Sequence, residues 1–256
     1  MSTEPATISV REVTIGYART VIQHGLNFDV RRGEVFIILG TSGSGKSSLL
    51  KSMIGLYPPM SGKILFDGEN IVTATGKDRL RLLRKFGVMY QSCALFGAMT
   101  VLENVRLPLD EFTDLDPENK DLIALAKLNQ VGLVSAAWKM PSELSGGMQK
   151  RAAIARAMAL DPGILFLDEP SAGLDPITSA GLDALIRELS RDLGITFVVV
   201  THELASIYAI ADRCVMLDPA TKTMIAQGAP ADLRDGSDNP LVRQFFHREA
   251  ASAEGR

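Results

Sequence analysis

The sequence predicts an α/β fold built around a mostly parallel β-sheet, and three stretches carry this prediction. An apolar run at residues 35–39 is followed by a glycine-rich loop and by a helix-like segment at 48–54. Two further apolar runs, at residues 163–167 and 195–200, are separated by a helical pattern over 177–192. Strands that alternate with helices are typical of a parallel sheet covered by helices on both faces.

Composition places the chain among ordinary globular proteins. Of its 256 residues, 46% are hydrophobic and 22% are charged, which excludes an intrinsically disordered chain. The net charge is −3 and no long basic block is present, so nucleic acid is not the expected partner. The longest apolar runs are far shorter than a membrane span, and residues 1–6 lack the pattern of a secretory signal. We therefore expect the chain to stay in the cytosol.

The two cysteines predict no disulfide framework and no zinc site. Cys93 and Cys214 are far apart in the chain and lack the spacing of metal ligands. We interpret both as reduced thiols that pack in the core.

The N-terminal part is predicted to be antiparallel β-structure. Apolar and polar residues alternate over 8–15 with a slip at 11–12, and a second strand is predicted at 26–30. The second strand is expected to turn at 31–33 into the strand at 35–39, in a hairpin-like arrangement. A short strand at 63–66 and an amphipathic helix at 77–85 come next.

The middle of the chain has a different character. A compact strand at 86–90 stops at Gln91, residues 92–109 are apolar but irregular, and helical spacing returns over 121–134 and 145–160. We interpret residues 92–157 as a helical insertion within the α/β core.

The chain closes with a hairpin and a short C-terminal segment. Strands at 213–217 and 223–226 flank the hairpin turn, an acidic turn follows, and a terminal helix is predicted at 241–246 before a frayed tail. The predicted division is an α/β domain over residues 8–228 and a C-terminal segment over 229–256. We hypothesise that Leu241, Val242, Phe245 and Phe246 pack on a neighbouring subunit.

The glycine-rich loop has the context that a phosphate-binding loop requires, since a strand precedes it and a helix follows. Glycines let successive backbone N–H groups point at phosphate oxygens, and the helix adds its positive N-terminal end. Lys46 would reach the β- and γ-phosphates, and the Ser47 hydroxyl would bind Mg²⁺. The residues of the predicted loop and the start of its helix are Gly40, Thr41, Ser42, Gly43, Ser44, Gly45, Lys46, Ser47 and Ser48.

Polar residues at the ends of other strands narrow the chemistry. Asp168, at the end of a buried strand, can hold Mg²⁺ through water, and Glu169 is placed to orient a water that attacks the γ-phosphate. Because ligands of parallel sheets bind at the carboxyl ends of the strands, we expect Gly40, Gln91, Asp168 and His202 to gather at one edge.

A second phosphate-binding segment is predicted at a later helix start. Ser145, Gly146 and Gly147 precede a helix and would expose backbone N–H groups and a hydroxyl. Since the chain already has one phosphate loop, this segment suggests that the nucleotide of another copy is its target, and hence a dimer.

Taken together, these motifs resemble those of an ABC-type ATPase, a P-loop NTPase with a RecA-like core, an N-terminal antiparallel β-subdomain and an inserted helical subdomain. They occur in the family's order and run through residues 8 to about 228. The residues that carry the resemblance are Tyr17, the loop at 40–47, Gln91, the segments 144–148, 164–169 and 171–175, and His202.

The resemblance implies a head-to-tail homodimer with two ATP molecules and Mg²⁺ between the subunits. It implies that Tyr17 stacks on adenine, that Gln91 binds Mg²⁺ and couples to a membrane partner, and that Asp175 joins the two sites. It also implies that His202 contacts the γ-phosphate and that Glu169 is the base. By themselves, Tyr17 would be read as a packed aromatic residue and His202 as a histidine at a helix start.

The sequence departs from the family's pattern at two positions. Met148 stands where the family usually has Gln, and Gly173 adds one residue to the usual Ser-Ala-Leu-Asp segment. Neither change removes a group that would face phosphate, so we expect activity to be retained.

A narrower resemblance concerns the ATPase subunit of Mla-type, MCE-associated phospholipid transporters of bacterial envelopes. It is carried by segments 66–71, 91–96, 140–148, 175–178 and 239–246. It implies an integral-membrane permease, an MCE-domain lipid-binding protein, often a STAS-domain protein, and a peripheral place at the cytoplasmic face of the inner membrane. The apolar stretch at 93–109 would then dock a cytoplasmic helix of the permease, unless it is simply a self-packed insertion.

Three alternatives remain open from the sequence. The chain could be the ATPase of another ABC transporter, such as a small-solute importer. A soluble ABC ATPase that acts on DNA or ribosomes would need a coiled coil, a second ATPase copy or basic arms, which the sequence lacks. A non-hydrolysing scaffold is disfavoured because Lys46, Asp168, Glu169 and His202 are all present.

Overall fold

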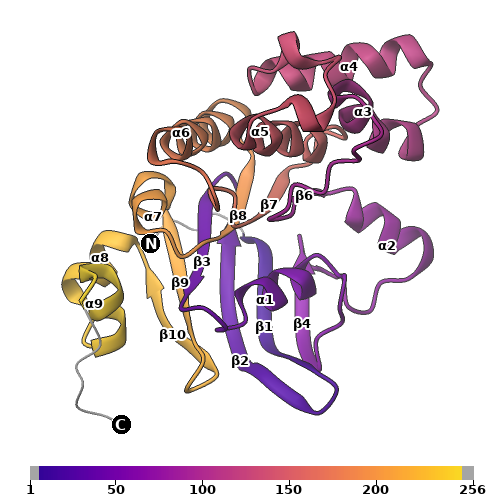
Figure 1. The fold of residues 1–256 in the computed structure, drawn as a ribbon. Coiled ribbons are helices and arrows are strands. Elements are labelled where there is room, and N and C mark those ends of the chain that lie inside the picture. The colour runs from indigo at the N-terminus through magenta and orange to yellow at the C-terminus, as the bar shows by residue number, and fades with distance from the viewer. Residues whose placement is uncertain (1–5, 250–256) are drawn as a thin grey trace. The chain divides into compact units, whose positions relative to one another are not determined.

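The computed structural model describes residues 6–249, which divide into two compact units (Figure 1). Unit 1 contains the chain up to residue 73 together with the chain from residue 200 onward, and unit 2 contains residues 74–199. Both units contain strands and helices.

An antiparallel sheet forms the first part of unit 1. β1 (Ala6–Tyr17) pairs with β2 (Thr20–Arg31) on one side and with β4 (Ser61–Phe66) on the other, and β5 (Glu69–Asn70) pairs with β4. The slip in the alternating pattern of β1 is a bulge, because its register shifts between Val10 and Val13 and Glu12 has a φ of 49°. The antiparallel start predicted from the sequence is confirmed.

The remaining strands of unit 1 are the strand that leads into the predicted phosphate loop and two strands beside it. β3 (Val35–Gly40) runs parallel to β9 (Arg213–Asp218), and β9 pairs antiparallel with β10 (Thr223–Gly228), as the closing hairpin predicts. The expectation of a hairpin between β2 and β3 was wrong, because β2 pairs with β1 and β3 pairs with β9. All six residues of β3 are buried, whereas β2 has alternating exposure. The two strands therefore suit different sheets.

Within residues 6–249, the helices of unit 1 are α1 (Lys46–Met53), α7 (Leu204–Ile210), α8 (Pro230–Gly236) and α9 (Pro240–His247). The acidic turn expected before the terminal helix is in fact α8, which begins with Pro230 in its first turn and buries Leu233. Pro230 and Leu233 are the buried residues of this helix, too few to give a periodic signal in the sequence.

The terminal helix packs on its own chain. Val242 and Phe246 of α9 are 0% and 4% exposed, and the Tyr208 hydroxyl of α7 donates a hydrogen bond to the Phe246 carbonyl at 3.2 Å. The hypothesis that these two residues pack on a neighbouring subunit was therefore wrong. Leu241 is 46% exposed, and the tail predicted to be frayed lies outside the described residues from position 250 onward.

Unit 2 contains three strands and their connecting helices. α2 (Gly76–Leu83) leads into β6 (Phe86–Met89), which runs parallel to β7 (Ile164–Asp168), and β8 (Thr196–Val200) lies on the other side of β7. α6 (Pro176–Leu193) connects β7 to β8 and ends at Gly194, which has a φ of 66°. Every residue of β7 and β8 is buried, as expected for strands covered on both faces.

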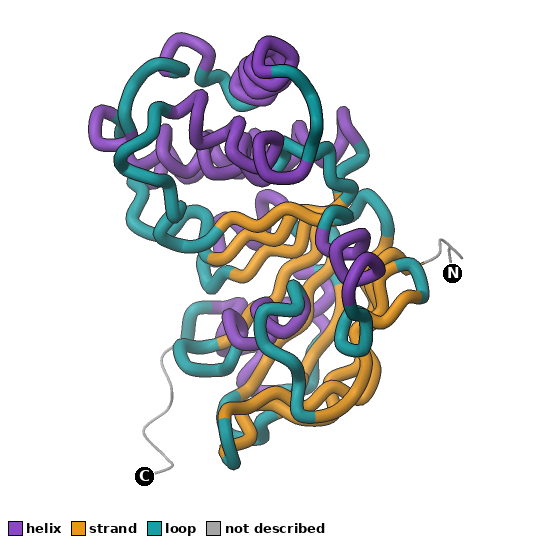
Figure 2. Tube along the Cα trace, turned by 90° about the vertical axis from the view of Figure 1, so that its right-hand side faces the viewer, coloured by secondary structure: helices purple, strands orange, loops and turns teal. Residues whose placement is uncertain are grey.

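Residues 92–157 contain only helical elements among the described residues. α3 (Val101–Phe112), α4 (Pro117–Gln130) and α5 (Gly146–Ala157) pack together, among the helices drawn in purple in Figure 2. The short helices η1 (Val134–Ala136) and η2 (Pro141–Glu143) connect α4 to α5. α3 begins at a capping box in which Thr100 and Glu103 cap each other's backbone N–H groups. Pro108 lies inside α3 and breaks its sequence pattern, which is why this helix looked irregular.

Candidate functional site

The predicted phosphate loop lies between β3 and α1 in unit 1. Gly43 and Gly45 adopt left-handed conformations with φ of 78° and 89°, which favour glycine. A Cβ at Gly45 would lie 2.5 Å from Ile22 Cγ2, and a Cβ at Gly40 would lie 2.5 Å from the Leu217 carbonyl oxygen. Glycine is therefore favoured at position 43 by conformation alone, and at positions 40 and 45 by both conformation and space.

Lys46, the first residue of α1, lies across this loop. Its Nζ donates hydrogen bonds to the carbonyl oxygens of Gly40 at 2.9 Å and Thr41 at 3.0 Å, and the residue is 8% exposed. An ammonium group held on neutral carbonyls can transfer to phosphate oxygens, which form stronger, charge-assisted hydrogen bonds. Ser47 and Ser48 follow in the first turn of the same helix.

Tyr17 lies at the same end of unit 1 as the phosphate loop. Its hydroxyl is 3.3 Å from Ser48 Oγ, and its ring meets Tyr57 edge-on at a centroid distance of 5.8 Å. The residue is 46% exposed. Tyr57, which sequence reasoning did not single out, thus supports the Tyr17 ring from the side with an edge-to-face contact.

His202 also belongs to unit 1 and follows the end of β8. The preceding Thr201 is fully buried, and its backbone N–H donates to the Ile38 carbonyl at 3.3 Å. Thr201 Oγ1 accepts a hydrogen bond from the backbone N–H of Glu203 at 3.1 Å. These contacts fix the backbone on either side of the exposed His202 side chain.

Unit 2 holds the acidic pair predicted to act on the nucleotide. Asp168 is the last residue of β7 and is 7% exposed. Glu169 follows with a φ of 47°, a left-handed conformation that costs a non-glycine residue free energy. β6 and β7 are parallel and pair Met89 with Leu167. Gln91 and Asp168 therefore lie at the same, carboxyl-terminal end of these two neighbouring strands.

The loop after Gln91 is held by two basic side chains of α5. Lys150 Nζ donates to the Gln91 carbonyl at 2.7 Å, and the Arg156 guanidinium donates to the carbonyls of Cys93 and Ala94, both at 2.7 Å. Cys93 and Ala94 both have a positive φ, of 62° and 49°. Sequence reasoning missed Lys150 and Arg156, because they act on backbone carbonyls and leave no pattern in the residues that they hold.

The segment predicted to bind a second phosphate caps α5. Ser145 Oγ accepts the backbone N–H of Met148 at 3.3 Å, a bond that any residue at position 148 can donate. A Cβ at Gly147 would lie 2.4 Å from Thr178 Cγ2 of α6, so glycine is required at this contact. Gly146 precedes it in the first turn of α5.

The start of α6 lies against this segment and is capped by Asp175. The carboxylate accepts the backbone N–H groups of Ile177 and Thr178, both at 3.0 Å, and the Thr178 hydroxyl. The hydrogen bond from the Thr178 hydroxyl and those from the backbone lower the pKa of Asp175. The extra residue Gly173 is accommodated in an exposed left-handed turn, with a φ of 79°.

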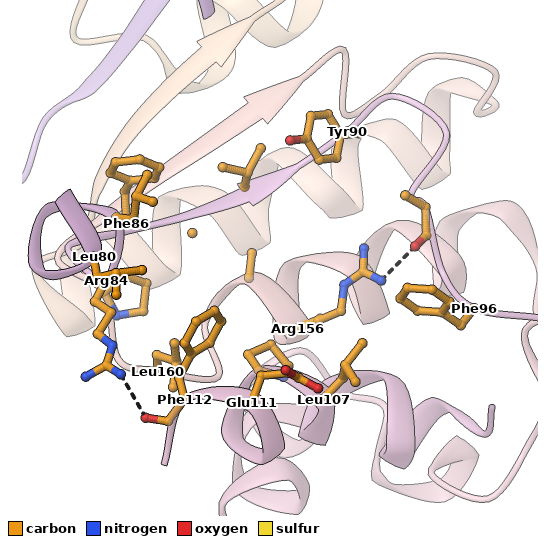
Figure 3. A pocket seen from close by; sticks show the side chains of 17 residues that line it. Leu80, Arg84, Phe86, Tyr90, Phe96, Leu107, Glu111, Phe112, Arg156 and Leu160 are labelled. Atoms are coloured by element: carbon orange, nitrogen blue, oxygen red, sulfur yellow. Dashed lines mark hydrogen bonds between the residues drawn. The ribbon is translucent and has the colours of Figure 1, made fainter. Parts of the chain in front are cut away.

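An apolar cavity of about 470 Å³ lies in unit 2 beside the loop that follows Gln91 (Figure 3). Arg156 reaches from α5 to the Ala94 carbonyl beside Phe96, and Arg84 donates to the Phe112 carbonyl at 3.2 Å. Phe96 and Leu80 of its lining are 52% and 51% exposed. Burial and the Asp168 carboxylate raise the pKa of the Tyr90 phenol, while Arg156 lowers it. The larger apolar lining residues are Leu80, Leu83, Phe86, Tyr90, Phe96, Leu107, Phe112 and Leu160.

Neither a preformed metal site nor a membrane span is found in the described part of the chain. Residues 6–249 contain no group of three or more His, Cys, Asp or Glu residues able to hold a metal ion. No helix within the same residues is both long enough and apolar enough to cross a bilayer.

Comparisons with known proteins agree with this geometry. Residues 23–172 match the family described as ABC transporter. The chain is 44% identical over 93% of its length, and 88% of the relative, to the intermembrane phospholipid transport system ATP-binding protein MlaF of Escherichia coli K12. It is 39% identical to the probable ribonucleotide transport ATP-binding protein mkl of Mycobacterium leprae, over 94% of this chain and 68% of the relative.

Solved structures show the same fold. The dimeric structure of MJ0796, a bacterial ABC transporter cassette, matches with a TM-score of 0.78 and 30% identity, over 87% of this chain and 98% of that chain. A second structure of the MJ0796 dimer, in a post-hydrolysis state bound to ADP and Pi, matches equally well. The fold class predicted from the sequence is confirmed, with the refinement that antiparallel β10 makes the strand pairing mixed.

Proposed function

Because this chain belongs to the ABC transporter family and is one of its ATPases, we propose that two copies close around two ATP molecules and drive a membrane permease that moves phospholipid. The observation that carries the nucleotide part is the loop of unit 1, in which Gly43 and Gly45 are left-handed and the Lys46 ammonium group contacts the Gly40 and Thr41 carbonyls. The phospholipid part is supported by the 44% identity to MlaF along 93% of the chain.

The proposed nucleotide contacts follow from the loop and the strand ends. Lys46 moves from the Gly40 and Thr41 carbonyls to the β- and γ-phosphates, and Tyr17 stacks on the adenine. His202 contacts the γ-phosphate. The loop residues between Gly40 and Ser48 donate backbone N–H groups to the phosphates.

The residues present fit Mg²⁺ bound together with the nucleotide. Mg²⁺ is commonly held by one or two protein groups plus substrate phosphates and waters, so a three-residue cluster is not required. We propose that Ser47 and Gln91 bind the ion directly and that Asp168 binds it through water. The bound ion would stabilise charge on the transferred phosphate, and Glu169 would accept the proton of the attacking water.

The second half of each site is proposed to come from another copy of the chain. Ser145, Gly146 and Gly147 begin α5 and present its N-terminal end, where negative charge is stabilised. Asp175 caps the neighbouring α6 and would lie at the same subunit interface. The dimer of MJ0796 shows that a related cassette pairs with itself.

The apolar cavity of unit 2 is proposed to receive a short cytoplasmic helix of the permease. Its lining combines exposed Leu80, Phe96 and Phe112 with the guanidinium groups of Arg84 and Arg156. This chemistry suits an amphipathic helix with a few apolar anchors and an acidic residue at its edge. Tyr90 and Ala94, which stand on either side of Gln91 in the chain, line the cavity, so a helix bound there would act on the backbone that carries the proposed Mg²⁺ ligand.

The permease would hold the chain at the cytoplasmic face of the inner membrane. Within the proposed system, an MCE-domain lipid-binding protein lies beyond the membrane and a STAS-domain protein binds the ATPase. The cargo is the part of the proposal that needs a direct test, because the mycobacterial relative is named for ribonucleotide transport.

The test uses the complex purified from membranes through a tagged chain. We expect permease subunits and phospholipid to co-purify, and we expect Glu169→Gln to bind ATP and accumulate as a closed dimer with hydrolysis slowed at least about 100-fold. Parental turnover by Glu169→Gln would exclude Glu169 as the base. Recovery of nucleotide cargo without phospholipid would exclude the lipid assignment.

A further inference from the structure

Gln23 is a buried amide directly beneath the phosphate loop. It belongs to β2 and is 0% exposed. Its Nε2 donates one hydrogen bond to the Ser44 carbonyl at 2.8 Å and one to the Asp218 carbonyl at 3.0 Å. One side chain thus joins the antiparallel sheet, the phosphate loop and the end of β9.

The two acceptors fix the orientation of this amide. Carbonyl oxygens only accept hydrogen bonds, so the flipped amide would set its own oxygen against two acceptors. Gln23 Oε1 has no partner among the described residues, and an amide with an unpaired buried atom is costly. The two hydrogen bonds that Nε2 donates therefore account for a polar side chain at this buried position.

The part of β2 that contacts the loop is itself hydrogen-bonded to the β9–β10 hairpin. The His24 N–H donates to the Lys222 carbonyl at 2.8 Å, and Thr223 Oγ1 donates to the His24 carbonyl at 3.1 Å. A Cβ built on Gly45 would lie 2.5 Å from Ile22 Cγ2 and 3.3 Å from Gln23 Cγ. The loop thus rests on residues that the β9–β10 hairpin holds in place.

We propose that Gln23 is a positioning residue for nucleotide binding, because its amide holds the Ser44 carbonyl in the loop conformation that accepts phosphate. The proposal rests on the proposed function, in which ATP binds at residues 40–48. When the bond is removed, the loop populates other conformations, and the apparent affinity falls by the fraction of molecules that remain competent.

The test compares Gln23→Met with Leu26→Met. Methionine keeps the unbranched shape of Gln23 but cannot donate to either carbonyl. Leu26 lies on the same strand and is also fully buried, and Leu-to-Met exchanges conserve volume, so it controls for inserting methionine into β2. The probe is the fluorescent ATP analogue mant-ATP with Mg²⁺. We expect Gln23→Met to weaken its binding about tenfold, equivalent to ~1.4 kcal/mol, and Leu26→Met to bind like the parent.

Two further measurements separate positioning from general destabilisation. Without nucleotide, backbone amides of residues 41–46 should exchange with deuterium faster in Gln23→Met than in Leu26→Met. The two variants are compared at urea concentrations that give them the same free energy of unfolding. In the parent, the Gln23 side-chain amide protons should exchange slowly with solvent. This last measurement needs no variant, so it remains decisive if Gln23→Met folds poorly.

The proposal is overturned if Gln23→Met binds mant-ATP like the parent, or if the Gln23 amide protons of the parent exchange freely. Failure of the proposed function has a different signature. In that case the parent itself would not bind mant-ATP, or Lys46→Ala would bind it as tightly as the parent does.

Discussion

At the scale of single residues, the nucleotide loop is organised by donors directed at backbone carbonyls. Lys46 Nζ contacts the carbonyls of Gly40 and Thr41, and Gln23 Nε2 contacts the carbonyl of Ser44. The lysine bonds are exchangeable, because phosphate oxygens are stronger acceptors for an ammonium group than neutral carbonyls are. The glutamine amide is 0% exposed, so no water reaches it to replace these two acceptors.

This distinction predicts different behaviour for two lysines of α1. Lys46→Ala removes the charge that would contact the β- and γ-phosphates, so affinity for Mg²⁺-ATP should fall at least about 100-fold, or ~2.8 kcal/mol. Lys51 lies in the last turn of the same helix, and Lys51→Ala should bind ATP like the parent. Isothermal titration calorimetry measures both. Equal affinities for the two variants would contradict the assignment of Lys46.

At the scale of elements, the loop after β6 depends on α5. The left-handed conformations of Cys93 and Ala94 are unfavourable for non-glycine residues. They persist because the Arg156 guanidinium binds both carbonyls. α5 is capped by Ser145 and carries Arg156 in its last turn, so one helix links the predicted phosphate-binding segment to the loop that follows Gln91.

Substitutions of Arg156 test this link. Arg156→Ala leaves two carbonyls without their donor and should lower the free energy of unfolding by about 2 kcal/mol. Arg156→Lys keeps the charge but lacks the planar fork that reaches both carbonyls, so its loss should be smaller. Urea unfolding followed by circular dichroism gives both values. If all three proteins unfold at the same urea concentration, Arg156 does not stabilise the loop.

The sequence predicted the elements whose patterns are local. The loop glycines, the buried strands β7 and β8 and the ends of α6 all follow from composition and spacing. α3 was missed because Pro108 interrupts its apolar pattern, although the Thr100–Glu103 capping box marks its start. The predicted hairpin between β2 and β3 does not form, because β3 pairs in parallel with residues 213–218, a partner that lies far away in the sequence.

The candidate site was predictable to the extent that its residues carry side-chain motifs. Asp168, Gln91 and Gly40 stand at strand ends, where sequence reasoning placed them. Gln23, Lys150 and Arg156 were missed because their partners are backbone carbonyls. Gln23 precedes the strand predicted at 26–30, whereas β2 begins at Thr20, so no strand pattern indicated that this residue is buried.

At the scale of the whole molecule, each unit contains one buried thiol. Cys214 of β9 is in unit 1, and burial raises its pKa to about 12. Cys93 is in unit 2, and burial raises its pKa as well. Buried thiols with raised pKa values react slowly at pH 8, because the thiolate is the reactive form. Labelling of either cysteine therefore requires its unit to open.

These thiols predict how nucleotide affects each unit. ATP without Mg²⁺ is expected to use the loop of unit 1, since Gln91 and Asp168 of unit 2 are proposed to act through the ion. At 100 times its Kd, ATP should stabilise that unit by ~2.7 kcal/mol and slow labelling of Cys214 about 100-fold. Cys214 pairs in register with Ile37 of β3, the strand that leads into the loop, so it reports directly on this stabilisation.

Single-thiol variants, Cys93→Ala and Cys214→Ala, allow each rate to be followed separately with an aromatic disulfide reagent. Labelling of Cys93 should slow by a smaller factor if the two units open independently. Equal slowing of both thiols would show instead that the chain opens as one cooperative unit, and unchanged labelling of Cys214 would contradict ATP binding at the loop of unit 1.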